Sequence, residues 1–135
     1  MSPILYPERS HILGHGTTIA DVEAEIRRLV FAFDEFVKHL PLAEYSTGDG
    51  LVKPGHMIQK PIDLTIRMLS PETYAASGWY RYLGCRMHLD IGEYALWGDI
   101  VETIAHEVCH RYRPAIETHS PIFWMLLAET MMGAY

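Results

Sequence analysis

The sequence predicts a small α+β domain with a long N-terminal helix, a small and mostly antiparallel sheet, and two further helices near the C-terminus. Three observations predict this class. Apolar residues follow a helical repeat over residues 19–40, they alternate with polar residues over 62–68 and 83–91, and a second helical pattern occupies 100–112. Helices repeat every 3.6 residues and strands every two, so the periodicities separate the two kinds of element.

The composition is that of an ordinary globular protein. The chain has 135 residues, of which 49% are hydrophobic and 21% charged, and this fits one domain over residues 1–135 with a sizeable core. No apolar run approaches the length of a membrane span, and the first residues lack the pattern of a signal peptide. We therefore expect a cytoplasmic protein without a membrane partner. The net charge of −6 argues against direct binding to nucleic acid.

Cys85 and Cys109 are the only cysteines, which is too few for a disulfide scaffold. We expect both to be buried thiols that pack as small apolar groups. Cys109 lies within the second helical pattern, on the side away from the histidines of that segment.

The first helix follows an irregular arm. Residues 1–16 contain two prolines, two glycines and no sustained periodicity. The helical repeat begins after Thr18, and Pro41 marks its end. Its apolar positions are Ile19, Val22, Ile26, Leu29, Val30, Phe33, Phe36, Val37 and Leu40.

The middle of the chain predicts a long loop and then two strands. Residues 41–61 contain several turn-forming glycines and prolines. In residues 62–68 and 83–91 the alternation of apolar and polar side chains gives each strand one buried and one solvated face. His88 falls on the solvated face.

A helix is expected next, over about residues 100–112. Asp99 and Glu102 have the spacing of a capping box, and Pro114 lies just beyond the expected end. The last helix is expected to begin at Pro121, with Ser120 as its N-cap. That helix is strongly apolar, and core burial is the simplest reason for its residues Phe123, Trp124, Leu126, Leu127 and Met131.

The most informative motif of the chain is His106-Glu107-Val108-Cys109-His110. Its four-residue spacing puts both imidazoles on one face of a helix, where they can hold one divalent ion. The other faces carry the apolar residues Ile100, Val101, Ile104, Ala105 and Val108. We therefore expect the histidine face to lie opposite the core and to open onto a cleft.

A catalytic zinc ion usually takes three protein ligands and a water molecule. His106 and His110 supply two nitrogen ligands, and a histidine-rich site favours Zn²⁺ over other divalent ions. Glu107 can take a proton from a metal-bound water and deliver it to a leaving amine. This division of roles predicts a zinc peptidase.

Three downstream residues are candidates for the third ligand. His119 is favoured, because histidine suits zinc and the capped helix that follows would hold its backbone firmly. Glu117 and Glu129 are the alternatives.

The run CRMHLDIG, the segment ETIAHEVCHRY and the following THSPIFWMLLAE resemble the catalytic core of the SprT-like zinc metallopeptidases. They are equally similar to the related short bacterial metal-dependent hydrolases. The resemblance covers roughly residues 62–130, with a shorter spacer between the second and third histidines than in many SprT-like members. It implies a minimal zincin fold with His106, His110 and His119 as zinc ligands and Glu107 as the general base.

The resemblance also indicates how a substrate would bind. In zincins the substrate lies extended along an edge strand beside the metal helix, and position predicts residues 81–91 for this strand. A developing oxyanion could be stabilised by any of five side chains, although packing is the simpler role for each: Tyr80, Tyr82, Tyr112, Arg111 and Arg113.

Two other functions remain open. One is a non-catalytic zinc-binding module for protein interaction, with the metal enclosed by four protein ligands. The other is a regulatory peptidase with one dedicated protein substrate. A convincing fourth ligand is missing from the sequence, which favours an open catalytic site and a protein or peptide substrate.

Overall fold

The computed structural model describes residues 18–40, 60–69, 73–81, 84–112 and 121–134. The predicted arm over residues 1–16, most of the predicted loop over 41–61, and the candidates Glu117 and His119 lie outside the described residues. The elements are α1 (Ile19–Lys38), β1 (Asp63–Met68), β2 (Ala76–Arg81), β3 (Arg86–Ile91), α2 (Trp97–Tyr112) and α3 (Pro121–Ala134). The predicted α+β class is confirmed.

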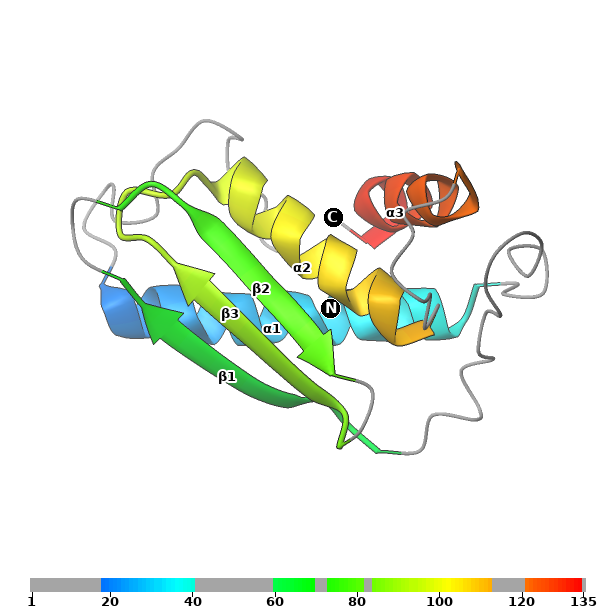
Figure 1. Ribbon diagram of the computed structural model, residues 1–135, viewed down its shortest axis with the longest axis horizontal. Helices are drawn as coiled ribbons and strands as arrows, with labels where there is room; N and C mark the ends of the chain where they lie inside the picture. The colour runs from blue at the N-terminus through cyan, green and yellow to red at the C-terminus, as the bar shows by residue number, and fades with distance from the viewer. Residues whose placement is uncertain (1–17, 41–59, 70–72, 82–83, 113–120, 135) are drawn as a thin grey trace.

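The three strands form a mixed sheet in the order β1-β3-β2. β1 runs parallel to β3, and β2 runs antiparallel to it, so the expectation of a mostly antiparallel sheet is wrong. Figure 1 shows the sheet in front of α1 and α2, which cover one face, while α3 lies beside α2. The inward side chains of the central strand are fully buried, namely Met87, Leu89 and Ile91.

The first helix forms as predicted, and its start is fixed by a capping box. The Thr18 side chain accepts from the backbone N–H of Asp21 at 3.2 Å, and the Asp21 carboxylate accepts from the backbone N–H of Thr18 at 3.3 Å. Both contacts satisfy amides that have no partner inside the helix. The predicted apolar stripe faces the core, with Val22, Ile26, Leu29, Val30, Phe33 and Val37 buried.

One strand, β2, was not expected from the sequence. Its inward positions include Ala76 and Gly78, so no alternation of large apolar residues marks it. The small residue at position 78 is required by packing. A Cβ there would lie 2.7 Å from both the His88 carbonyl oxygen and Cδ2 of Leu89.

The start of α2 also differs from the prediction. The helix begins at Trp97, and the Leu96 carbonyl accepts from the backbone N–H groups of Asp99 and Ile100 at 3.1 Å each. Asp99 therefore lies inside the first turn, and the predicted capping box of Asp99 with Glu102 is wrong. The charge of the Asp99 carboxylate still interacts favourably with the positive end of the helix dipole.

Burial of α3 follows the prediction only in part. Leu126 and Leu127 are buried, as expected, and Met131 packs against the core from a half-buried position. Trp124 is instead 47% exposed. The apolar composition of the helix made core burial the expectation for Trp124 as well, whereas the helix packs on α1 and α2 along one side only.

The two cysteines are free thiols in different surroundings. Cys109 is fully buried, as expected, and its Sγ lies 3.6 Å from Oγ1 of Thr130 on α3. Cys85 is only half-buried and has a φ of 52° at the turn before β3, so the expectation of burial is not met there. In the described part of the chain, no helix is long and apolar enough to cross a membrane.

Gly78→Ala is expected to destabilise the protein by about 1–3 kcal/mol, because the new methyl group overpacks the contact between β2 and β3. Chemical denaturation monitored by circular dichroism measures this change. Ser77→Ala, on the exposed side of the same strand, is the control and should change stability by less than about 0.5 kcal/mol. Equal stability of the two variants would contradict the packing argument.

Candidate metal centre

The two histidines of α2 approach each other through their Nε2 atoms, which lie within hydrogen-bond distance. Nε2 of His106 and Nε2 of His110 lie 3.0 Å apart, and their rings meet edge to face with centroids 4.7 Å apart. Two nitrogen ligands of a tetrahedral zinc ion, each bonded at 2.0–2.1 Å, are about 3.4 Å apart. The observed separation is close to this value, so only a small opening of the pair would admit an ion.

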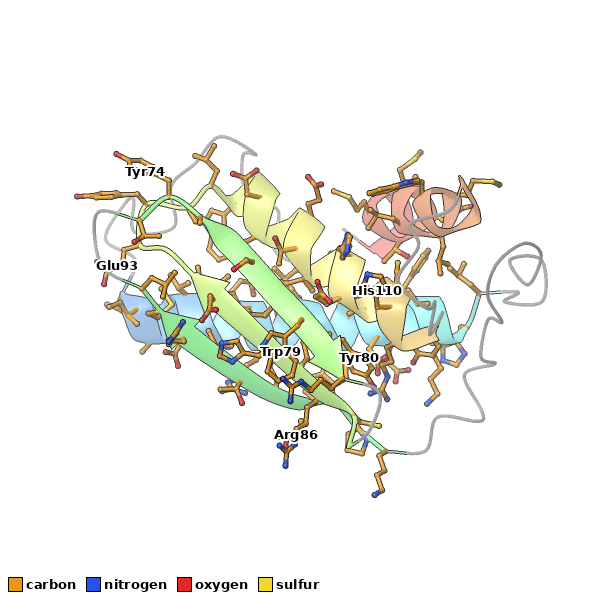
Figure 2. The ribbon with its side chains drawn as sticks, in the orientation of Figure 1. Tyr74, Trp79, Tyr80, Arg86, Glu93 and His110 are labelled. Atoms are coloured by element: carbon orange, nitrogen blue, oxygen red, sulfur yellow. The ribbon has the colours of Figure 1, made fainter. Side chains whose placement is uncertain are left out.

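The buried and the partly exposed faces of α2 are those that the sequence predicted. Ile100, Val101, Ile104, Ala105 and Val108 are all buried, whereas His106 and His110 are partly exposed. The helix therefore turns its apolar face to the core and leaves the imidazoles accessible. Figure 2 shows His110 on α2, in the region between β2 and α3.

Glu107 projects from a side of α2 that is neither the apolar face nor the histidine face, and it lies under β2. Its side chain is 7% exposed, and a Cβ at Gly78 would lie 3.6 Å from its Cγ. Burial raises the pKa of Glu107 to about 7, since a carboxylate loses hydration there. The glycine of β2 thus leaves space for the carboxyl-bearing side chain between the strand and the helix.

The strand above Glu107 is an edge of the sheet. The backbone N–H groups of Gly92 and Tyr94 donate to the carbonyls of Ala75 and Thr73. In an antiparallel ladder, hydrogen-bonded residue pairs alternate with pairs that exchange no hydrogen bonds. Because Thr73 and Ala75 belong to hydrogen-bonded pairs, the N–H and C=O groups of Ala76, Gly78 and Tyr80 point away from β3.

The predicted edge strand is therefore wrong. Residues 86–91 form β3, which is paired on both sides. The edge of the sheet beside α2 belongs to β2, which pairs with no second strand in the described part of the chain. The hydroxyl of Thr103 on α2 lies 3.4 Å from the carbonyl oxygen of Ala76, which shows that the helix runs close to this edge.

The described residues supply two of the three expected metal ligands. Among them, no group of three or more histidine, cysteine, aspartate or glutamate side chains could hold an ion. Glu129 is exposed on α3 and does not join His106 and His110 in such a group. The favoured third ligand, His119, and its alternative Glu117 lie outside the described residues.

The end of α2 is tied to α1 by a buried ion pair that the sequence did not reveal. Arg111 is 2% exposed, and its Nε lies 3.1 Å from Oδ1 of Asp34, without hydrogen-bond geometry. Its Nη2 donates to the Lys60 carbonyl at 2.6 Å, and its Nη1 lies 3.4 Å from the Tyr80 hydroxyl. The Tyr112 hydroxyl donates to Oδ1 of Asp34 at 2.7 Å.

These contacts assign Arg111 and Tyr112 to packing between the helices. Burial is the main cause of the raised pKa of Tyr112, and its hydrogen bond to Asp34 adds to the shift. Desolvation also raises the pKa of Asp34, with Tyr112 and Arg111 acting in the opposite direction. Three of the five oxyanion candidates, Tyr80, Arg111 and Tyr112, thus have structural partners, while Tyr82 and Arg113 lie outside the described residues.

Comparison of the chain with models of protein families, with curated proteins and with solved structures gave no match. The arrangement of His106, Glu107 and His110 beside the edge of β2 is therefore the basis for assigning a function.

Arg111→Met is expected to destabilise the protein by about 3–5 kcal/mol, because it leaves the Asp34 carboxylate, which is only 14% exposed, without its cation. Urea denaturation measures the loss. Arg67→Met is the matched control, since Arg67 pairs with Asp90 at 2.8 Å but is 65% exposed. That change should cost about 1 kcal/mol or less, and a similar cost for both variants would count against a buried pair.

Proposed function

We propose that this chain is a zinc-dependent metallopeptidase of the SprT-like type, with a minimal zincin fold. The observation that carries the proposal is the approach of the His106 and His110 Nε2 atoms to 3.0 Å, on a helix that also buries Glu107 under β2, the strand at one edge of the described sheet. The long helix α1, the small sheet and the motif-bearing helix α2 suit such a fold.

His106, His110 and His119 would hold the zinc ion, which would acidify a bound water and polarise the substrate carbonyl. The donor set suits this role, since the Nε2 atoms of His106 and His110 already lie 3.0 Å apart. Partly accessible histidines next to a buried carboxylate are also typical of hydrolytic metal centres.

The residues of this chain would divide the remaining work. The Glu107 carboxylate accepts a proton from the attacking water and delivers it to the nitrogen of the leaving amine. The outward N–H and C=O groups of Gly78 and Tyr80 can pair with an extended substrate backbone and hold it beside the carboxylate. Positioning of this kind lowers the entropic part of the barrier.

Zinc binding tests the ligand assignment. The purified wild type is expected to hold about one zinc ion per chain, and His106→Ala, His110→Ala and His119→Ala should each lose most of it. Metal analysis by mass spectrometry measures the content. His39→Ala is the control, because His39 is exposed at the end of α1. Full zinc content in His119→Ala would point to Glu117 as the third ligand instead.

Activity tests the role of the carboxylate. Glu107→Gln should keep the zinc and lower the hydrolysis of an unfolded protein such as casein by about 100-fold or more, since it removes the general base. Glu102→Gln, an exposed change on the same helix, should retain full activity. If Glu107→Gln hydrolysed the substrate at the wild-type rate, the peptidase mechanism would be refuted, and a non-catalytic zinc module would become the better assignment.

A further inference from the structure

One face of α3 presents apolar side chains to solvent next to the histidine pair. This face, the α3 stripe, consists of Trp124, Met125, Ala128 and Met132, all exposed. Met125 is 58% exposed and Met132 is 85% exposed. Their spacing places them on one side of the helix, whereas the opposite side is buried through Leu126, Leu127 and Thr130.

The stripe is continuous with the candidate metal centre. The rings of Trp124 and His106 approach edge to face, with centroids 6.2 Å apart. α2 contacts both β2 and α3 and lies between them in Figure 1. The partly exposed histidines therefore have the edge strand β2 on one side and the α3 stripe on the other.

The chemistry of the stripe indicates what would lie against it. Covering exposed tryptophan and methionine side chains with an apolar group is favourable, because it removes apolar surface from water. Methionine is flexible and polarizable, so a methionine-rich surface adapts to apolar groups of different shapes. An extended segment on the edge of β2 would direct alternate side chains to one side of its backbone.

We propose that the α3 stripe is an apolar subsite, which makes segments with bulky apolar side chains the preferred substrates. This rests on the proposed peptidase function and specifies its substrate class. Leu, Phe and Met side chains are expected to be accepted with similar affinity, because the methionines of the stripe rearrange around each of them. Such segments are exposed in unfolded or loosely folded polypeptides and buried in native ones.

Peptide binding to an inactive variant tests the subsite without turnover. In full-length Glu107→Gln protein, fluorescence anisotropy would compare labelled peptides that carry Leu, Phe or Met at the central positions with a peptide that carries Ser and Asn there. The apolar peptides are expected to bind about tenfold more tightly. Adding Met125→Gln or Met132→Gln should weaken their binding about threefold each and leave the polar peptide unaffected.

Phe31→Gln is the matched control, since Phe31 is 62% exposed on α1 and distant in sequence from the stripe. It should leave the affinity of every peptide unchanged. Equal binding of apolar and polar peptides, or equal effects of all three substitutions, would overturn the subsite. So would a change in sedimentation on Met132→Gln with unchanged peptide affinity, because the stripe would then be a contact between two copies of the chain.

The two proposals fail in different ways. If the wild type hydrolyses no peptide but the Glu107→Gln protein still prefers apolar ones, the peptidase function fails and the apolar subsite stands. If the wild type hydrolyses apolar and polar peptides equally well, the subsite fails and the peptidase function stands.

Discussion

Successive side chains on an α-helix are rotated by about 100°, and the layout of this domain around α2 depends on that rotation. The apolar residues of α2 pack against α1 and the sheet. Glu107 lies under β2, and the two histidines are partly exposed to solvent. Because residues 106 and 110 are one turn apart, their imidazoles converge at 3.0 Å. Because Glu107 is the next residue after His106, its side chain turns toward the strand and becomes buried. One helix thus fixes the histidine pair and the carboxylate relative to the sheet.

The orientation of that helix is held at its C-terminal end by the contacts of Arg111. A buried guanidinium and carboxylate lose hydration, and their attraction offsets this cost only when other hydrogen bonds complete the arrangement. Here the Lys60 carbonyl accepts from Arg111 and the Tyr112 hydroxyl donates to Asp34. Arg111 directly follows His110, so the contacts that secure its guanidinium to α1 also limit movement of the second imidazole. The ion pair contributes to the geometry of the candidate site without lying in it.

The sequence was informative where a feature depends on residues close together in the chain. The helical repeat predicted α1, and the four-residue histidine spacing predicted a shared direction that the Nε2 separation matches. These features follow from the geometry of one helix, whatever surrounds it. The same reasoning predicted the burial of Ile104 and Val108.

Features that depend on distant contacts were not predictable in this way. The strand β2 was missed because two of its three inward residues are small, and only the positions of Leu89 and the His88 carbonyl show why Gly78 must lack a side chain. The pairing of Arg111 with Asp34 joins residues that are far apart in the chain. Likewise, the composition of α3 showed that the helix is apolar but not which side packs, since that depends on where α1 and α2 lie.

The burial of Glu107 is difficult to explain by packing alone. An ionisable group taken out of water costs free energy unless charges or hydrogen bonds compensate, and desolvation is the cause found for its raised pKa. A glutamine or an apolar residue of similar size would fill the same space under Gly78 at lower cost. Under the proposed peptidase function, a carboxyl group placed there, next in sequence to His106 and below the edge strand β2, would move a proton. Under that proposal, this one position exchanges stability for chemistry, as catalytic sites commonly do.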